Sequence, residues 1–305
     1  MHIPEARVIW MDGQLVPWAD AQVHVLSHAL HYGTGVLEGT RVYATAAGPM
    51  AFRLEEHVRR LERSARMLRL PLPYDRAALL TASSDLVREN DLTSCYLRHA
   101  AFFGYGVIGL DTREAPVRTV IAAWEMGSYL GAEGERHGIT LGTSSWRRSD
   151  PNAAPTAAKA TGPYLNSVLA KREALESGYD EALLLNRDGY VAECSAENVF
   201  VIRDGAVLTP PSSAGALEGI TADSVRTLAA DLGHRVEAVN LLRSDLYAAD
   251  EVFVTGTAAG IVPVRSLDRR DIGGPGPVTE RLRELLNAVT AGEEPRYKHW
   301  LTPVG

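Results

Sequence analysis

Short apolar segments joined by tight turns, together with one long amphipathic segment, set the pattern of this 305-residue chain. Asp12-Gly13, Asp188-Gly189 and Asp204-Gly205 each separate two short apolar runs, an arrangement typical of a β-hairpin. Between the first and second of these hairpins, apolar residues recur at helical spacing over residues 54–70 and predict a helix that ends before Pro71. We therefore expect a mixed α/β (α+β) protein built from strand pairs and covering helices.

The length of the chain suits one large or two medium domains. A polar, glycine-bearing stretch after residue 126 favours two. We predict a small N-terminal α/β domain over residues 1–127, a linker over 128–138, and a larger C-terminal α/β domain over 139–305 that carries Lys159. The sequence contains no Walker A or G-x-G-x-x-G motif, which disfavours the common nucleotide-binding folds.

Composition excludes several classes of partner. The net charge is −7 without any lysine-rich run, so we expect no nucleic acid partner. No apolar run reaches the roughly 20 residues that a membrane span needs, and the first residues do not resemble a signal peptide. Cys95 and Cys194 are far apart and form no C-x-x-C pair. These features predict a cytoplasmic protein without disulfides.

Lys159 is one of three lysines, against 28 arginines among the 31 basic residues. Every residue within five positions of it is small, hydroxylic, a proline or Tyr164, and none is a carboxylate. Loss of hydration in such surroundings disfavours the charged ammonium form, and a neutral, positioned amine is what Schiff-base chemistry requires. A surface loop with its lysine in water explains the same segment without a special role.

Other segments carry potential binding chemistry. Tyr96 and Arg98 are two residues apart in an apolar strand, so they share a face, and the arginine needs a carboxylate from the protein or a ligand. Glu193 also lies in an apolar strand, where an inward orientation needs a positive or protonated partner. The helix start at residues 219–221 and the turn at residues 255–259 offer amides and hydroxyls suited to a phosphate.

Two local patterns remain open to more than one interpretation. His24, His28 and His31 have a spacing that places three imidazoles on one helical face, which raises a zinc hydrolase as an alternative of a different class. No acidic residue stands between them as a general base, and glycines follow at once. On the amphipathic helix, helical geometry does not decide which arginine reaches an anion; the candidates are Arg59, Arg60, Arg63 and Arg66.

Six ordered blocks then carry a resemblance over nearly the whole chain. They read HALHYG, EHVRRL, PTAAK, E-x-x-x-ENVF, LEGIT and GTAA, at residues 28–33, 56–61, 155–159, 193–200, 217–221 and 256–259. With them the chain resembles bacterial branched-chain amino acid aminotransferases, which are fold-type IV pyridoxal 5′-phosphate enzymes. The resemblance implies a two-domain fold with the cofactor between the domains. It also implies a homodimer, in which Tyr32 and the loop 104–109 reach in from the partner subunit, and no resident metal.

The resemblance also implies roles for individual residues. Lys159 would form the internal aldimine with pyridoxal 5′-phosphate and move the proton between substrate and cofactor. Tyr164 would bind the ring hydroxyl, Glu193 the pyridine nitrogen and Arg60 the phosphate. The other implied cofactor contacts are Leu217, Gly219, Ile220, Thr221 and Thr257. The implied substrate contacts are Tyr32, Leu37, Gly39, Tyr96, Arg98, Met126, Tyr129, Thr257 and Ala258.

The implied reaction is ping-pong transamination. An L-branched-chain amino acid (leucine, isoleucine or valine) would give its amino group to the cofactor, and 2-oxoglutarate would accept it to form glutamate. Alternatives within the fold type are a D-amino acid aminotransferase, an R-selective amine aminotransferase and aminodeoxychorismate lyase. Leu37 and Met126 replace aromatic residues expected in the side-chain pocket, which concerns substrate range more than reaction type, and Cys194 replaces an expected glycine.

Overall fold

A computed structural model describes residues 3–127 and 129–305 of the chain. The chain divides into two compact units. Unit 1 comprises Met1–Gly127, Ala158–Gly162 and Ala288–Gly305, and unit 2 comprises Ser128–Ala157 and Pro163–Asn287. This division differs from the sequence-based domains, because Lys159 and the C-terminal residues belong to unit 1. The segment predicted as a linker contains a short helix, α4 (Ala132–His137).

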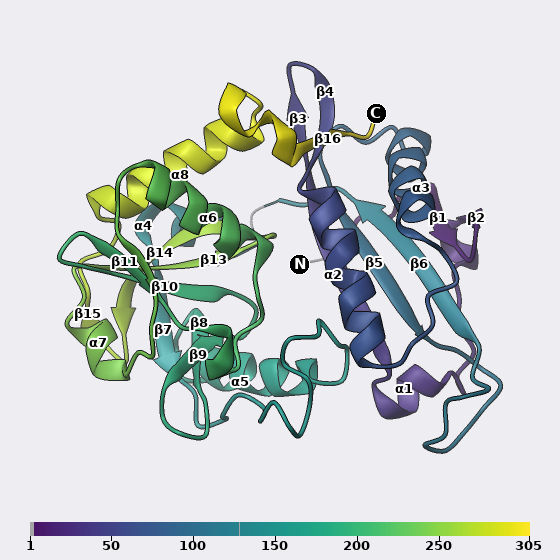
Figure 1. Cartoon of the computed structure of the whole chain (residues 1–305), viewed down its shortest axis with the longest axis horizontal. Helices are drawn as coiled ribbons and strands as arrows, with labels where there is room; N and C mark the ends of the chain where they lie inside the picture. The colour runs from purple at the N-terminus through teal and green to yellow at the C-terminus, as the bar shows by residue number, and fades with distance from the viewer. Residues whose placement is uncertain (1–2, 128) are drawn as a thin grey trace. The chain divides into compact units, whose positions relative to one another are not determined.

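In the described part of unit 1, seven strands form one antiparallel sheet (Figure 1). The order is β16-β4-β3-β5-β6-β1-β2. The predicted hairpin at Asp12-Gly13 is confirmed, and both residues have positive φ, as a type I′ turn requires. The strands are β1 (Val8–Met11), β2 (Gln14–Pro17), β3 (Gly35–Thr45), β4 (Gly48–Phe52), β5 (Cys95–Phe103), β6 (Val117–Trp124) and β16 (Leu301–Pro303).

Two helices, α2 (Leu54–Met67) and α3 (Arg76–Glu89), lie over one face of this sheet (Figure 1). The apolar stripe predicted for residues 54–70 is buried, but the helix ends at Met67 because Arg69 adopts a left-handed conformation. Asp75 caps α3 by accepting a hydrogen bond from the Ala78 amide at 2.8 Å. The shorter helices of unit 1 are η1 (Trp18–Asp20), α1 (His28–Tyr32) and η3 (Pro295–Trp300).

The described strands of unit 2 form a nine-stranded mixed sheet. Its order is β12-β11-β10-β13-β14-β7-β8-β9, and β15 pairs with β14. The pairs β14–β7, β7–β8 and β11–β12 are parallel, and the remaining pairs are antiparallel. The strands are β7 (Ile139–Thr143), β8 (Glu181–Leu185), β9 (Val191–Cys194), β10 (Asn198–Arg203), β11 (Ala206–Thr209), β12 (Val236–Ala238), β13 (Glu251–Gly256), β14 (Gly260–Leu267) and β15 (Arg270–Asp271).

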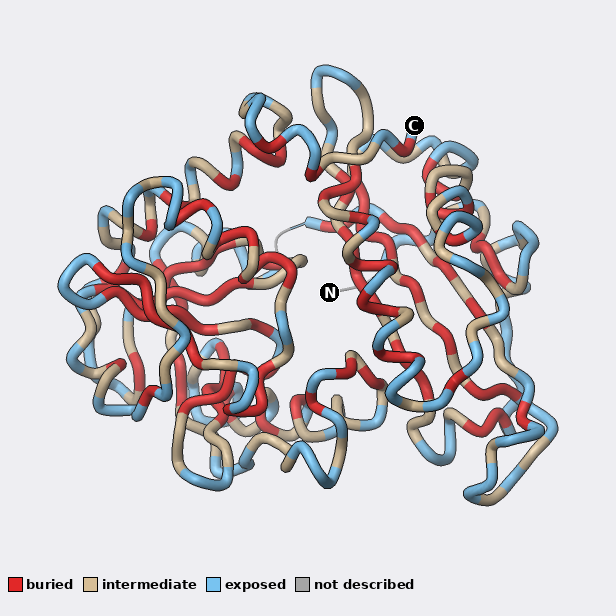
Figure 2. Tube along the Cα trace, in the orientation of Figure 1, coloured by how far each residue is buried: buried red, intermediate tan, exposed pale blue. Residues whose placement is uncertain are grey.

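Buried residues concentrate on the strands of each sheet and on the helix faces that cover them (Figure 2). Cys194 belongs to the core of unit 2, where it packs as a small apolar side chain. No helix among the described residues is both long enough and apolar enough to cross a bilayer. The helices of unit 2 besides α4 are α5 (Tyr164–Glu176), η2 (Ser212–Ala214), α6 (Ile220–Asp231), α7 (Arg243–Tyr247) and most of α8 (Pro277–Thr290).

We predict that Leu61→Ala destabilises unit 1 by about 2–5 kcal/mol, because Leu61 is fully buried between α2 and the sheet and its truncation leaves a cavity. Chemical denaturation of the purified variant measures this change. Arg66→Ala on the exposed side of the same helix is the matched control and should change the unfolding free energy by less than about 0.5 kcal/mol. Equal effects of the two substitutions would contradict this packing.

Candidate functional site

Lys159 is fixed through its backbone to two elements of unit 1. Its amide donates a hydrogen bond to Ser64 Oγ on α2 at 3.0 Å, and its carbonyl accepts one from the Leu37 amide on β3 at 2.9 Å. The next residue, Ala160, pairs with Val36 as an antiparallel bridge. Lys159 is half-buried, so the loss of hydration predicted for its side chain is only partial. The lysine therefore stands at a defined position on a rigid scaffold.

Arg60, on α2, belongs to a buried ion-pair group with His57 of the same helix and Glu38 of β3. Its Nε and Nη2 donate to the two oxygens of Glu38 at 2.5 Å and 2.9 Å, and His57 Nδ1 lies 2.7 Å from Glu38 Oε2. Burial acts to raise the pKa of Glu38, but Arg60 and His57 outweigh it and hold that pKa well below its ordinary value. Burial lowers the pKa of His57. At neutral pH the group is thus a carboxylate, a guanidinium and a neutral imidazole.

This burial separates Arg60 from the other arginines of α2. Arg60 is 3% exposed, whereas Arg59, Arg63 and Arg66 are exposed to solvent. A guanidinium held in one orientation by a fixed carboxylate is suited to bind a phosphate bidentately. Among the four arginines, Arg60 is the buried one, and its role as the phosphate contact stays a prediction.

A second group of unit 1 lies on β3 and β5. The register pairs Gly39 with Arg98 and Arg41 with Tyr96, so Tyr96 and Arg98 share a sheet face as predicted. A β-carbon on Gly39 would lie 1.7 Å from the Tyr96 hydroxyl, so this hydroxyl requires glycine beneath it. Arg98 Nε is buried and has no hydrogen-bond partner among the described residues. A donor in this position fits an anionic ligand group.

Tyr32, at the end of α1, lies in a region of unit 1 rich in exposed apolar side chains. His28 Nε2 lies 2.7 Å from the Gly109 carbonyl oxygen and links α1 to the loop 104–110. Met126 is buried, and its carbonyl accepts a hydrogen bond from Arg41 Nη2 at 3.1 Å. The exposed apolar residues of α1, of residues 21–27 before it and of the loop are Val23, Val25, Leu26, Leu30, Tyr32, Tyr105, Ile108 and Leu110.

The zinc interpretation of the histidines is wrong in its geometry. The helix begins only at His28, so His24 lies outside it and the three imidazoles share no helical face. His28 uses its other ring nitrogen on Thr34 Oγ1 at 2.7 Å, and His31 Nε2 lies 3.0 Å from the Val25 carbonyl oxygen. Among the described residues, no group of three histidine, cysteine or acidic side chains is placed to hold a metal ion.

Glu193, on β9 of unit 2, is the buried carboxylate that the sequence indicated. Its Oε1 lies 2.7 Å from Arg148 Nη2, and its Oε2 accepts a hydrogen bond from the Leu217 amide at 3.0 Å. Arg148 Nε donates in turn to the Gly215 carbonyl at 3.1 Å. The positive partner that an inward-facing glutamate requires is therefore Arg148, whose charge favours the ionised form of this carboxyl group.

The start of α6 is held next to Glu193 by Asn198. Asn198 Nδ2 donates to the Leu217 carbonyl at 2.9 Å, and a β-carbon on Gly219 would lie 1.9 Å from Asn198 Oδ1. Only glycine therefore permits this approach. The first turn of α6 includes Ile220 and the buried Thr221, and the helix dipole places a partial positive charge at this end of the helix. This start can bind a phosphate.

The remaining predicted residues are divided between the units. Thr257 and Ala258 follow β13 in a half-buried turn, Tyr164 is the first residue of α5, and Tyr129 is exposed; all four belong to unit 2 with Glu193, Leu217, Gly219, Ile220 and Thr221. The predicted residues in unit 1 are Tyr32, Leu37, Gly39, Arg60, Tyr96, Arg98, Met126 and Lys159.

Three residues that position this chemistry were missed by sequence reasoning. Glu38 lies between Leu37 and Gly39 on β3, so its side chain points to the opposite face of the sheet from theirs. This alternation could have predicted that Glu38 faces α2. His57 occupies the apolar stripe of α2, but a histidine there is commonly structural. Arg148 stands 45 positions before its carboxylate partner in an irregular segment, and no local pattern marks it.

Comparisons with known proteins identify the family of this chain. A family model described as amino-transferase class IV matches residues 35–267. The chain is 45% identical to the branched-chain-amino-acid aminotransferase of Salmonella typhimurium, over 100% of this chain and 99% of that protein.

Solved structures are equally similar. A T.th. branched-chain amino acid aminotransferase with pyridoxamine 5′-phosphate is 49% identical, with a TM-score of 0.96 and 99% of each chain covered. The T.th. enzyme complexed with N-(5′-phosphopyridoxyl)-L-glutamate is 46% identical, with a TM-score of 0.94 and 99% of each chain covered. The chain therefore belongs to the class IV amino-transferase family.

Proposed function

We propose that this protein is a pyridoxal 5′-phosphate-dependent aminotransferase that moves an amino group between an L-branched-chain amino acid and 2-oxoglutarate. The observation that carries the proposal is the placement of Lys159, held by β3 and α2 in unit 1. The same unit contains the buried Arg60 and Arg98, whose Nε has no hydrogen-bond partner among the described residues. The names of the relatives supply the substrate class, and the glutamate adduct of the T.th. enzyme supports glutamate as the second product.

The donor set fits pyridoxal phosphate. A Schiff-base cofactor needs an amine, its pyridine nitrogen needs a carboxylate, and its phosphate needs cationic and amide donors. Lys159, Glu193, Arg60 and the start of α6 provide these groups, and we propose that they serve the same cofactor. When bound, the cofactor supplies an aldehyde that binds amines covalently and a ring that accepts the electrons released from the substrate Cα.

Lys159 has two tasks in this proposal. Its Nζ would hold the cofactor covalently in the resting enzyme, and it would be free for acid–base work once an amino acid substrate has taken its place in the first half-reaction. The freed Nζ then takes the proton from the substrate Cα and returns it one position along, as a general base and then a general acid. The backbone hydrogen bonds to Ser64 and Leu37 keep the lysine at one place during both tasks.

Glu193 keeps the cofactor's ring nitrogen protonated. Its carboxylate stays ionised because Arg148 and the Leu217 amide both bind it. An ionised carboxylate favours the protonated form of a pyridine nitrogen at hydrogen-bond distance, which strengthens the ring as an electron acceptor. Tyr164 is proposed to donate to the ring hydroxyl, and Leu217 to pack against the ring.

The phosphate is proposed to bind Arg60 together with the amides of Ile220 and Thr221 and the hydroxyls of Thr221 and Thr257. Glu38 fixes the orientation of Arg60 through two hydrogen bonds. The helix dipole of α6 favours an anion at its first turn. The Arg60 guanidinium and the dipole of α6 would together keep the phosphate bound throughout the reaction.

The substrate carboxylate is proposed to bind Arg98 and the Tyr96 hydroxyl, with the amides of Thr257 and Ala258. Leu37 and Met126 are proposed to line the pocket for the branched side chain, with Gly39 leaving room beside Tyr96. A site built to bind a carboxylate disfavours amines that lack one. We therefore expect L-amino acids to be better substrates than amines without a carboxylate.

We further propose that the active form is a homodimer. The exposed apolar residues of α1, the segment before it and the loop 104–110 form a surface of the kind that pairs with another protein surface. In the family resemblance, the equivalents of Tyr32 and of this loop reach the partner's active site. A second copy of this chain is therefore the proposed partner.

We predict that Lys159→Ala abolishes transamination between L-leucine and 2-oxoglutarate, because no other amine replaces Nζ in either task. The rate of glutamate formation measures this, and reduction with borohydride should no longer attach the cofactor to the protein. Lys298→Ala, an exposed lysine in η3, is the matched control and should react normally. Normal turnover by Lys159→Ala would refute the proposed function.

We also predict that Arg98→Ala lowers kcat/KM for L-leucine by about 10- to 150-fold, the equivalent of losing ~1.5–3 kcal/mol from a hydrogen bond to a charged group. Reaction with 1-phenylethylamine, which has no carboxylate, should change little. Steady-state kinetics with both amines measure the difference, and the exposed Arg113→Ala is the control. Equal losses for both amines would remove the proposed role of Arg98.

A further inference from the structure

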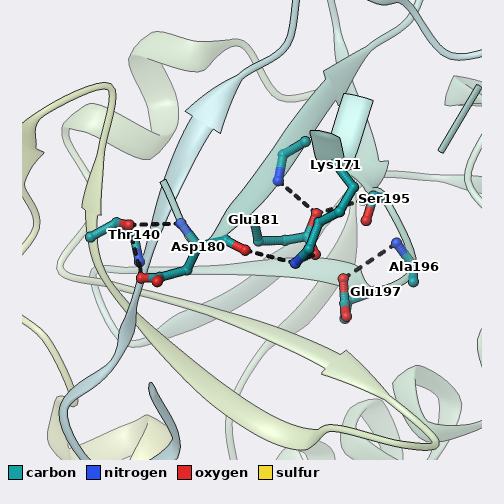
Figure 3. A network of polar contacts seen from close by, with 8 residues as sticks. Thr140, Lys171, Asp180, Glu181, Ser195, Ala196 and Glu197 are labelled. Carbon is teal, nitrogen blue, oxygen red and sulfur yellow. Dashed lines mark hydrogen bonds and ion pairs between the residues drawn. The ribbon is translucent and has the colours of Figure 1, made fainter. Parts of the chain in front are cut away.

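Unit 2 contains a second polar network, in which Glu181 contacts Lys171 and Ser195, and Glu197 contacts Ala196 (Figure 3). Ser195, Ala196 and Glu197 follow Glu193 closely in the chain. Glu181, at the start of β8, is fully buried, and its Oε2 lies 2.6 Å from Lys171 Nζ of α5. Its Oε1 accepts hydrogen bonds from the Ala182 amide at 2.6 Å and the Ser195 amide at 3.3 Å. Glu181 is thus a well-satisfied carboxylate that holds the turn between β9 and β10.

Glu197, in the same turn, has very different partners. It is 2% exposed, and its Oε2 accepts one hydrogen bond, from the Ala196 amide at 3.3 Å. Its Oε1 is buried and has no partner among the described residues. No ion pair of Glu197 is found in residues 3–127 and 129–305. The carboxyl is therefore buried without the support that an ionised form needs.

The charges of the neighbourhood lead to the same conclusion. Three buried carboxyl groups, of Glu181, Glu193 and Glu197, share two cations. Lys171 binds Glu181 at 2.6 Å and Arg148 binds Glu193 at 2.7 Å, so both cations are committed. A third buried negative charge would repel the other two, and protonation of the unsupported carboxyl removes this cost.

The position of Glu197 connects two parts of the proposed site. The Cys194 amide donates to the Glu197 carbonyl at 2.8 Å and closes the turn that follows Glu193. The register of β10 with β13 pairs Asn198 with Thr255, which brings Glu197 opposite Gly256. A β-carbon on Gly256 would lie 3.5 Å from Glu197 Cγ. The side chain thus packs between the turn after Glu193 and the turn that carries Thr257 and Ala258.

We propose that Glu197 is a positioning residue that is held as a neutral carboxylic acid, so that it joins the two turns while Glu193 remains the anion that serves the cofactor. This inference rests on the proposed function, which assigns Glu193 its role. It separates two glutamates only four positions apart into a neutral structural acid and an ionised carboxylate. Arg148 pairs with Glu193, whereas no ion pair of Glu197 is found among the described residues.

The groups that face Glu197 support this state. They are Glu181 from β8, Lys171 from α5, and Glu193 and Cys194 from β9, while Glu251 of β13 pairs with Ile202 at the other end of β10. Burial, reinforced by the negative charge of Glu181, raises the pKa of Glu197 from its ordinary 4.5 to about 8, although Lys171 acts in the opposite direction. The folded protein then holds one proton more than the unfolded chain between these two values, so the stability contributed by this group falls as pH rises from about 4.5 to about 8.

The test is the pH dependence of unfolding of the apoenzyme, with Glu197→Gln beside the wild type from pH 5 to pH 9. Glutamine has the same shape and stays neutral, so its variant should lack this proton and lose less stability as pH rises. The slopes should differ by up to one proton per molecule below about pH 8. Glu89→Gln, an exposed glutamate, is the matched control for the loss of one carboxyl group. Parallel slopes for the wild type and Glu197→Gln would overturn the proposal.

A second measurement uses the wild type alone and so does not depend on the folding of Glu197→Gln. Infrared spectroscopy of the wild type should show the carbonyl stretch of a protonated buried carboxyl at pH 7, and this band should disappear as pH rises above about 8. Its absence at pH 7 would overturn the proposal. Neither readout needs cofactor or turnover, so a protein without aminotransferase activity would still report the state of Glu197.

The link to the cofactor is tested by the affinity for pyridoxal 5′-phosphate between pH 7 and pH 9. The affinity of the wild type for pyridoxal 5′-phosphate should fall above about pH 8, where Glu197 becomes charged. The affinity of Glu197→Gln should lack this additional fall. Glu197→Ala, which removes the contact between the two turns, should weaken binding by roughly tenfold at pH 7. The same pH dependence in Glu197→Gln and the wild type would show that Glu197 does not act on the cofactor site.

Discussion

The backbone pairing between residues 158–162 and the start of β3 is the constraint on which the proposed chemistry depends. Gly33, Gly35 and Leu37 exchange hydrogen bonds with Lys159, Thr161 and Gly162, and Ser64 adds one from α2. The contacts with Gly33, Gly35 and Leu37 join residues more than 120 positions apart, and they place the lysine in unit 1 although the segments on either side of residues 158–162 belong to unit 2. A β-carbon on Gly33 would lie 2.7 Å from Gly162 Cα, so the close approach itself depends on glycine.

Buried charge is arranged by the same rule in both units. Arg60 and Glu193, which the proposal assigns to the cofactor, each have a fixed partner of opposite charge: Glu38 for Arg60 and Arg148 for Glu193. Such pairs contribute little net stability, because desolvation offsets their attraction, but they define the orientation and the protonation state of each group. Glu197 is the contrasting case: it is buried without an ion-pair partner in the described part of the chain, which favours the neutral acid. Orientation and protonation together are what a site for an anionic cofactor and an anionic substrate requires.

Local patterns predicted much of the fold. The apolar stripe of α2, the β1–β2 hairpin and the shared face of Tyr96 and Arg98 depend on residues close in sequence, and the structure confirms all three. The domain membership of Lys159, the choice of Arg60 among four arginines and the partner of Glu193 depend on contacts between distant segments, so spacing alone could not decide them. The histidine spacing misled because the chain before His28 is not helical. The roles of individual site residues came from the six resemblance blocks and remain predictions.

The most direct test of the central claim is a half-reaction followed by near-ultraviolet and visible absorbance. Purified protein saturated with pyridoxal 5′-phosphate is mixed with L-leucine alone, and the released keto acid is measured in parallel. The account predicts loss of the absorbance band of the lysine-bound cofactor, release of about one keto acid per site, and return of the band when 2-oxoglutarate is added. A spectrum that is featureless and unchanged by added pyridoxal 5′-phosphate would contradict the account.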